Sequence, residues 1–306
     1  MNVDPDDVDP GELEGTVRWE ELLAETEGRL RAADLDGNPT LHARWIVEEI
    51  VGSSATHFRE GLQQPATVRA VAKLDSMVQR RCGGEPIQYV LGHWAFRELD
   101  LLVDDRVLIP RPETEIVAGL VLDELDRLRP PGSGQTGTVV DLGSGSGAIG
   151  LSVASERPGT RVVLTDSSDD ALAVARANLA GLGMRGASVE VHAGSWFDAL
   201  PERLRGECDV VASNPPYVPA GDELPASVEA WEPASALRSG ADGLDDLRKI
   251  VADARPWLGP AGAIVLEMDP RQIEPMTALL QEHGFDTGTH PDLAGRHRAI
   301  VARLRT

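Results

Sequence analysis

The stretch Thr138–Gly147, TVVDLGSGSG, decides the fold of this chain of 306 residues. Its first half is a short apolar run, and its second half carries glycine at every other position. Glycine lets the backbone turn tightly after a strand, and it lets a ligand approach the N-terminus of the helix that follows. The stretch therefore predicts a buried strand, a ligand-binding turn and a helix, in that order.

After this turn, short apolar runs typical of buried strands alternate with segments of helical periodicity. The predicted strands cover residues 162–166, 189–191, 209–212, 263–266 and 299–301, and predicted helices begin near residue 146 and cover residues 171–179, 244–254 and 272–282. Such alternation is typical of an α/β fold with a mostly parallel sheet that helices cover on both faces. Ligands of such sheets bind at the carboxyl ends of the strands, where the strand order reverses.

Three regions precede this α/β domain, which we place at residues 110–306. Residues 1–15 are acidic and carry two prolines, which predicts a loosely attached tail. Residues 16–84 show the helical spacing of apolar side chains, for example over Trp19–Leu30, and no strand alternation, so we expect a small helical domain. Residues 85–109 place two apolar runs around a polar and aromatic segment, which predicts an extended or hairpin connection.

The charge balance favours a protein or a small molecule as substrate. The chain has 29 basic and 50 acidic residues, a net charge of −21. A protein that binds nucleic acid through its phosphates is expected to carry a basic face. No apolar run approaches the roughly 20 residues that cross a bilayer, and the acidic N-terminus lacks the features of a secretory signal. We therefore expect a cytoplasmic protein without a membrane segment. We also expect a monomer, although no sequence feature determines the oligomeric state.

Neither a disulfide framework nor a metal site is expected. Cys82 and Cys208 are too few for either a disulfide scaffold or a cysteine-rich zinc site. The 7 histidines show no paired-ligand spacing.

Two acidic residues strengthen the case for a nucleoside-bearing cofactor at the glycine turn. Asp141 stands just before the turn, and Asp166 ends the next predicted strand, 19 residues after Gly147. An acidic side chain at about that distance is placed to bind ribose hydroxyls, and Asp166 is equally suited to cap the following helix. A nicotinamide dehydrogenase is the competing interpretation, but its fingerprint, G-x-G-x-x-G, differs from the alternate glycines of this turn. The candidate cofactor-binding residues here are Asp141, Gly143, Ser144, Gly145, Ser146, Gly147 and Asp166.

The tetrapeptide Asn214–Tyr217, NPPY, indicates the chemistry. An amide nitrogen is a poor nucleophile because its lone pair is delocalised into the carbonyl group. The side-chain oxygen of Asn214 and the carbonyl of Pro215 are suited to accept its two N–H groups, which draws the nitrogen toward tetrahedral geometry. The prolines fix the backbone, and Tyr217 offers a flat face to a planar group. Positioning of this kind is worth up to roughly 7–11 kcal/mol.

We therefore assign candidate catalytic roles to Asn214, Pro215 and Tyr217, and substrate contacts to these residues and Pro216. Asn214 is also a candidate cofactor contact. An ordinary proline turn after a strand is the alternative. Together with the glycine turn, the tetrapeptide predicts an S-adenosylmethionine-dependent methyltransferase that acts on an amide or exocyclic amine nitrogen.

The chain resembles the protein release factor glutamine methyltransferase family (HemK/PrmC-like) over nearly its whole length. The stretches that carry the resemblance are Glu85–Tyr89, Leu108–Glu115, Asp141–Gly147, Trp196–Phe197, Asn214–Tyr217, Glu232–Pro233, Ala236–Leu237, Asp242–Leu244, Leu266–Glu267 and Asp292–Arg296. The chain departs from the family pattern at Ser195, where an acidic residue is frequent, and at Asp269, where glycine is usual.

The resemblance implies a class I S-adenosylmethionine-dependent methyltransferase domain of Rossmann-like fold, joined by a hairpin to a helical domain that helps to hold the release factor. It implies that the glycine turn and Asp166 bind S-adenosylmethionine and that Trp196 lies beside the adenine, although a plain core role for Trp196 competes. It also implies that Asn214–Tyr217 hold the target glutamine, in the Gly-Gly-Gln loop of a peptide chain release factor.

Three further functions stay open on the sequence. An adenine-N6 methyltransferase on DNA or RNA can use the same tetrapeptide, but it needs a basic groove and room for a flipped base. A methyltransferase for glutamine on a ribosomal protein is the second. The third is a protein that binds S-adenosylmethionine and works by association alone.

Overall fold

The computed structural model describes residues 14–52 and 54–305, and the chain divides into two compact units at Gly92 and His93. The predicted acidic tail, residues 1–15, lies outside the described residues except for its last two. Within the described residues, no helix combines the length and the apolar character needed to cross a membrane.

The N-terminal unit is built mainly from helices that share one apolar core. Its elements are β1 (Glu14–Arg18), α1 (Trp19–Ala32), α2 (Pro39–Val51), α3 (Ala55–Gly61), β2 (Pro65–Thr67), α4 (Val68–Cys82) and α5 (Ile87–Leu91). The predicted stripe of α1 is buried at Trp19, Leu22 and Leu30. Asn38 caps α2, because its side chain accepts hydrogen bonds from the backbone of Thr40 and Leu41.

Two predictions for this region were wrong. The sequence predicted no strand before residue 84, yet β1 and β2 pair antiparallel. The strand β2 is only three residues long, too short to show alternation. The apolar run Ile87–Leu91 is not extended but forms α5, which ends at Gly92 in the left-handed conformation.

A hairpin of β3 (His93–Phe96) and β4 (Leu99–Leu102) opens the second unit, inside the predicted connection. Arg97 turns the chain between the two strands with a φ of 52°. Its backbone N–H donates to the Glu115 carboxylate at 3.0 Å, and its guanidinium contacts both carboxylate oxygens of Glu156. The hairpin is therefore fastened to the helices of its own unit.

Asn178 fastens the other side of the hairpin. Its side-chain oxygen accepts from the Leu102 N–H at 2.7 Å, and its NH2 group donates to the Leu102 carbonyl at 3.1 Å. The same NH2 group donates to the carbonyl of Ser146 in the glycine turn, at 2.9 Å. The side-chain amide of Asn178 thus bonds the backbone of β4 as a second neighbouring strand would, and it also bonds the glycine turn.

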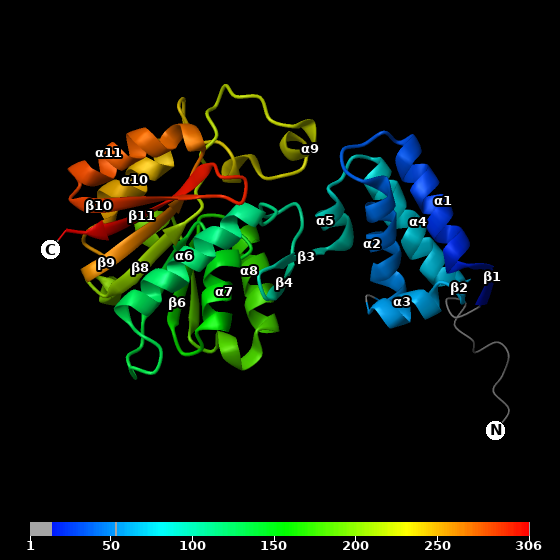
Figure 1. Cartoon of the computed structure of the whole chain (residues 1–306), viewed down its shortest axis with the longest axis horizontal. Helices are drawn as coiled ribbons and strands as arrows, with labels where there is room; N and C mark the ends of the chain where they lie inside the picture. Colours follow the sequence, from blue (N-terminus) through cyan, green and yellow to red (C-terminus); the bar gives the residue numbers. More distant parts are fainter. Residues whose placement is uncertain (1–13, 53, 306) are drawn as a thin grey trace. The chain divides into compact units, whose positions relative to one another are not determined.

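Among the described residues, seven strands of the second unit form one sheet, in the order β10-β11-β9-β8-β5-β6-β7 (Figure 1). The strands are β5 (Thr138–Leu142), β6 (Arg161–Asp166), β7 (Val189–Ala193), β8 (Cys208–Ser213), β9 (Leu258–Glu267), β10 (Phe285–Pro291) and β11 (His297–Leu304). Neighbours from β9 to β7 pair parallel, and β11 alone runs against the rest. The predicted α/β fold with a mostly parallel sheet is confirmed.

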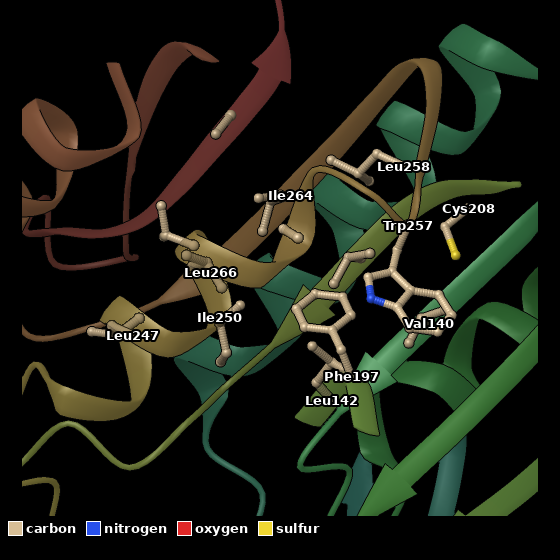
Figure 2. Packing of buried hydrophobic residues seen from close by; sticks show 14 of the residues in the cluster. Val140, Leu142, Phe197, Cys208, Leu247, Ile250, Trp257, Leu258, Ile264 and Leu266 are labelled. Atoms are coloured by element: carbon tan, nitrogen blue, oxygen red, sulfur yellow. The ribbon is translucent and has the colours of Figure 1, made fainter. Parts of the chain in front are cut away.

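Helices cover both faces of this sheet, as the predicted alternation requires (Figure 1). They are α6 (Pro112–Leu128), α7 (Ala148–Glu156), α8 (Asp169–Gly181), α10 (Asp245–Ala254) and α11 (Ile273–Glu282). The short helix α9 (Ala226–Glu229) lies in the long loop after β8 instead. Figure 2 shows the core beneath α10, where Leu247 and Ile250 belong to one buried cluster with Ile264 of β9 and with Phe197. Phe197 stacks on Trp257 with ring centroids 6.0 Å apart.

The strand β10 was not predicted. Of its residues only Phe285 is fully buried, and Gly288 and Pro291 interrupt the apolar pattern. It is held by its antiparallel pairing with β11, from Phe285 opposite Leu304 onward. A strand that lies at the sheet edge and buries one side chain leaves little signal in the sequence.

Candidate functional site

The parallel strands bring the candidate residues into one row. The neighbouring strands β6, β5, β8 and β9 are paired so that Thr165, Leu142, Ser213 and Leu266, in that order, lie side by side. The residues one position further along these strands are Gly143, Asp166, Asn214 and Glu267. Three of these four were predicted as site residues, and the carboxyl ends of the strands bring them together as the fold class requires.

Two cavities meet at this row. The first has a volume of about 260 Å³ and is lined by the glycine turn, Asp141, Asp166, Trp196 and Asn214. The second has a volume of about 340 Å³, and Asn214 and Tyr217 belong to its lining. Asn214 lines both cavities, so a ligand in each of them would meet at its side chain.

The glycine turn owes its shape to three left-handed residues. Gly143, Gly145 and Gly147 have φ of 68°, 54° and 85°, a region that costs other residues roughly 1–2 kcal/mol each. A Cβ on Gly147 would lie 2.8 Å from a methyl group of Leu151, whereas one on Gly145 would meet nothing within 4 Å. The alternate spacing of the glycines therefore reflects alternate left-handed positions.

Two polar atoms beside this turn have no hydrogen-bond partner among the described residues: Oδ1 of Asp141 and Oγ of Ser144. Both residues are buried and line the first cavity. The other oxygen of Asp141 accepts from the Gly150 N–H at 2.9 Å. Burial raises the pKa of Asp141 to about 7, with a smaller contribution from the charge of Asp166. Unpartnered buried acceptors are suited to a ligand that brings donors with it.

Asp166 organises the turn from the end of β6. One carboxylate oxygen accepts from the Gly145 N–H and the other from the Ser168 N–H, both at 2.9 Å. The cap of α8 is Ser168, whose hydroxyl accepts from the Ala171 N–H. Asp166 lines the first cavity and is only half-buried, so its remaining lone pairs are open to a ligand.

The position of Trp196 is compatible with both roles that the sequence left open. It lines the first cavity, and it also packs against the buried cluster of Figure 2. Its ring lies against Gly143, where an added Cβ would come within 3.0 Å of it. Its φ of 47° is unusual for a bulky residue. Such strained positions concentrate at ligand sites, where the surrounding structure holds them in place.

Asn214 follows β8 and is held by a side chain from far away in the sequence. Its Nδ2 donates to the hydroxyl of Thr114 at 3.2 Å, and that hydroxyl donates to Oε2 of Glu267 at 2.7 Å. Pro215 is buried, and Pro216 lines the first cavity. Thr114 of α6 lines the first cavity, and Glu267 lies behind it at the end of β9. The sequence suggested no role in the site for either residue.

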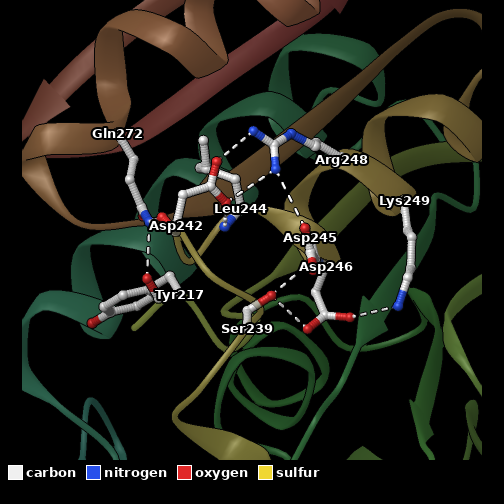
Figure 3. Close-up of polar contacts among 9 residues, drawn as sticks. All are labelled: Tyr217, Ser239, Asp242, Leu244, Asp245, Asp246, Arg248, Lys249 and Gln272. Atoms are coloured by element: carbon white, nitrogen blue, oxygen red, sulfur yellow. Dashed lines mark hydrogen bonds and ion pairs between the residues drawn. The ribbon is translucent and has the colours of Figure 1, made fainter. Parts of the chain in front are cut away.

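Tyr217 is fixed through its backbone. Its carbonyl accepts from Nε2 of Gln272 at 2.8 Å, and Gln272 also donates to the carbonyl of Asp242 at 3.4 Å (Figure 3). Burial raises the pKa of the Tyr217 hydroxyl well above its usual value, and the nearby Glu267 carboxyl adds to this rise. The hydroxyl is therefore protonated and neutral at physiological pH.

A polar network supports the segment that leads from Tyr217 to α10. Figure 3 shows Arg248 paired with Asp242, and Ser239 bonded to Asp246. The hydroxyl of Ser239 donates to the Asp246 carboxylate at 2.7 Å. Lys249 pairs with the same carboxylate at 3.3 Å and lines the first cavity.

At the two positions that depart from the family pattern, Asp269 and Ser195, the structure accommodates the residue without strain or burial. Asp269 has a φ of −67°, an ordinary value for any residue, and its side chain accepts from the Arg271 N–H as a cap. Ser195 is exposed and lines the first cavity beside Trp196. Among the described residues, no group of three or more metal-ligating side chains is placed to hold an ion.

Known glutamine methyltransferases are similar in sequence to this chain over most of its length. A family model for the methyltransferase small domain matches residues 116–231, and one for the PrmC N-terminal domain matches residues 21–92. The release factor glutamine methyltransferase of Deinococcus radiodurans is 36% identical over 94% of this chain and 99% of its own length. That of Burkholderia pseudomallei is 38% identical over 90% and 94%.

A solved structure supports the fold. The hMettl16 catalytic domain in complex with the MAT2A 3′UTR hairpin 6 has a TM-score of 0.51 and 13% identity, with 79% of this chain and 84% of that chain covered. The sheet order, the family models and this likeness agree on the class I methyltransferase fold. The chain belongs to the release factor glutamine methyltransferase family.

Proposed function

We propose that this enzyme methylates the side-chain amide nitrogen (N5) of the glutamine in the Gly-Gly-Gln loop of peptide chain release factors. The observation that carries the proposal is the position of Asn214 between two cavities. One cavity has the lining expected of a nucleoside-bearing cofactor, and the other ends at the amide and the ring of the NPPY segment. The relatives that share more than nine-tenths of their length with this chain are named for the same reaction.

The first cavity fits S-adenosylmethionine, which supplies an electrophilic methyl group on its sulfonium sulfur. The half-buried carboxylate of Asp166 is suited to the ribose hydroxyls, and the ring of Trp196 to the flat adenine. The unpartnered oxygens of Asp141 and Ser144 are suited to donors elsewhere on the ligand. Gly145 leaves open space for the ligand to approach the backbone.

The NPPY segment receives the amide. Because Nδ2 of Asn214 is bonded to Thr114, the side-chain oxygen is the end that remains to accept an N–H of the glutamine. The Pro215 carbonyl accepts the second N–H, and Tyr217 packs against the planar amide. The glutamine nitrogen takes the methyl group as the bond from that methyl to the sulfonium sulfur breaks, which leaves a neutral thioether. The nitrogen releases one of its two protons to solvent, so the product is a neutral N-methyl amide.

The charges of the second cavity favour a protein substrate over nucleic acid. Its three arginines are paired with carboxylates: Arg111 with Glu232, Arg271 with Asp222 and Asp269, and Arg298 with Asp292. A cavity whose cations are already paired attracts phosphates weakly, and the chain carries a net charge of −21. This observation argues against an adenine-N6 methyltransferase.

The remaining expectations belong to the same proposal. Residues 16–84 contact the release factor, and residues 110–306 catalyse the transfer. Residues 85–109 connect these two domains. The enzyme works as a monomer in the cytoplasm, where its substrate is made.

The test is methyl transfer to a recombinant, unmethylated release factor, with the site mapped by peptide mass spectrometry. We expect one methyl group on the glutamine of the Gly-Gly-Gln loop. Asn214→Ala should lower the rate of methyl transfer about 10²–10³-fold, the scale of one lost electrostatic contact in an active site, while S-adenosylmethionine still binds. Transfer to adenine in a parallel nucleic-acid assay, with none to glutamine, would overturn the proposal.

Two results would point to a different substrate or a different mode of action. Methylation of a ribosomal protein but of no release factor would keep the chemistry and change the substrate. An unchanged biological effect of Asn214→Ala, with the cofactor still bound, would mean that the protein works by association.

A further inference from the structure

Glu267 is a buried carboxyl group to which the reaction above gives no part. It ends β9 and is 1% exposed. Its nearest partner is the Thr114 hydroxyl at 2.7 Å, and that hydroxyl meets Asn214 at 3.2 Å. Three segments that are distant in the sequence thus form one hydrogen-bonded chain that ends at the residue between the two cavities.

The order of donors along this chain follows from the single proton of the hydroxyl. An ionised carboxylate only accepts, so the Thr114 proton must point to Glu267. The Thr114 oxygen then has only lone pairs to offer Asn214, which must turn its NH2 group toward it. Consequently the side-chain oxygen of Asn214 faces away from Thr114. Among the described residues no other hydrogen bond to the Asn214 side chain competes with this orientation.

We propose that Glu267 and Thr114 are positioning residues, which fix the side-chain amide of Asn214 with its oxygen turned toward the substrate. The inference rests on the proposed function, since it assigns to that oxygen the role of accepting an N–H of the glutamine. Neither residue touches the reacting atoms. They act through Asn214 by excluding the flipped orientation, which would present a donor to the substrate's own donors.

The reverse orientation becomes available when Glu267 is protonated. A neutral carboxyl donates to Thr114, whose own proton is then free to point at the oxygen of Asn214. Burial raises the pKa of Glu267 to about 7, the Thr114 hydrogen bond opposes this rise, and the charge of Glu113 adds to it. Arg298 and Arg111 lower the same pKa, and the neutral Tyr217 hydroxyl lies nearby. Activity should therefore rise with pH as Glu267 ionises.

Three variants of the full-length protein test the chain. Thr114→Val keeps the shape of the side chain and removes the hydroxyl, Thr114→Ser restores the hydroxyl, and Glu267→Gln removes the ionisation. We expect kcat for release-factor methylation to fall about tenfold in Thr114→Val, the scale of one lost hydrogen bond. Thr114→Ser should stay within about threefold of the parent. The KM for S-adenosylmethionine should stay unchanged in Glu267→Gln, because the Glu267 side chain lines neither cavity, and in Thr114→Ser, which keeps the hydroxyl.

The pH profile separates positioning from a merely structural role. The parent should lose kcat as the pH falls through the ionisation of Glu267, whereas Glu267→Gln should have a flat profile over the same range. A second readout needs no reaction: the side-chain NH2 resonances of Asn214 should shift with pH in the parent protein and stay unchanged in Glu267→Gln. That measurement tests the chain even if the substrate is another one.

The results that overturn the inference are distinct from those that overturn the function. Equal losses in Thr114→Val and Thr114→Ser, or an unchanged kcat in Thr114→Val, would exclude a role for the hydroxyl. If Thr114→Val fails to fold, the profile and the resonances of Glu267→Gln decide, and a profile like the parent's rejects the proposal. If instead the parent methylates no glutamine while the Asn214 resonances behave as expected, the proposed function fails and the positioning stands.

Discussion

The glycine turn and the NPPY segment occupy the ends of neighbouring strands, β5 and β8, yet they are held in different ways. The turn is shaped by its own glycines and by hydrogen-bond partners near in sequence: Asp166 lies 21 residues from Gly145, and Asn178, the furthest, lies 32 residues from Ser146. Asn214 depends on Thr114, 100 residues away, and Tyr217 on Gln272, 55 residues away. The cofactor side is thus built locally, and the substrate side is built from the tertiary fold. Substitutions should therefore separate cofactor affinity from the rate of transfer.

Among the substitutions that test this comparison, the largest expected effect is that of Gly243→Ala on the substrate side. A Cβ on Gly243 would lie 2.2 Å from the Tyr217 carbonyl oxygen and 2.6 Å from Nε2 of Gln272. The φ of 77° adds strain. Because a backbone oxygen cannot swing aside, the NPPY segment must shift, and a displacement on this scale costs about 10²-fold in rate.

Single-turnover transfer and calorimetric titration with S-adenosylmethionine check this prediction. The rate should fall by that factor while the affinity for the cofactor stays within about threefold, as expected for a change that reaches catalysis through geometry alone. An equal loss of affinity for S-adenosylmethionine would contradict this prediction, because it would mean that the substrate side and the cofactor side are coupled.

The second prediction pairs Gly145→Ala with Gly147→Ala on the cofactor side. Both residues are left-handed, so each variant should lose about 1–2 kcal/mol of stability from strain. Only Gly147→Ala adds a close contact, with Leu151, and it should therefore melt lower than Gly145→Ala. The added methyl of Gly145→Ala enters the space through which the ligand approaches, so this variant should bind S-adenosylmethionine about tenfold more weakly.

Melting curves and cofactor titrations of both variants distinguish the two effects. At saturating cofactor, kcat should match that of the parent in each. Equal affinities in the two variants would mean that Gly145 serves the turn alone.

The smallest effect concerns Asp141, whose pKa is raised from 3.8 to about 7 in the folded protein. The native state therefore holds this proton more firmly than the unfolded chain does, and the free energy of unfolding falls as pH rises between these two values. Asp141→Asn should flatten that fall, so that its melting temperature drops less than the parent's between pH 5 and pH 8. Ser144→Ala, which alters no titrating group, should keep the parent's slope. An equal slope in Asp141→Asn would contradict the assignment.

This last prediction sharpens the comparison because Glu267, on the substrate side, also has a pKa of about 7. Ionisation of either group lowers the free energy of unfolding, but if the two sides are built as described, only that of Glu267 changes kcat at saturating cofactor.

The sequence predicted the parts of this molecule that depend on neighbours in the chain. The strand β8 is a continuous apolar run, and the apolar side chains over Trp19–Leu30 have helical spacing, so both elements were found. The edge strand β10 and the short strand β2 were missed because they bury few side chains. The helix α5 was taken for an extended segment, since five apolar residues fit either conformation.

The same rule separates the residues of the site. The glycine turn and Asp166 were recognisable from spacing alone. Thr114 carries no local sign of its role, because that role exists only where α6 meets the ends of β8 and β9. Glu267 had a usable signal, an acidic residue at the end of an apolar strand, the same signal that marked Asp166. Some acidic residues at strand ends contact a ligand, and others contact another side chain. The distances in the folded structure decide between the two, and the spacing of residues in the sequence does not give those distances.

Asn178 gives the molecule a thermodynamic link between two of its parts. One side-chain amide bonds the backbone of β4 at Leu102 and the carbonyl of Ser146 in the cofactor turn. Any ligand that orders the turn favours the same amide geometry that closes the hairpin. Reciprocity then requires that an ordered hairpin strengthen cofactor binding by the same free energy. The hairpin follows directly after Gly92, where the N-terminal unit ends, so this link lies at the start of the second unit.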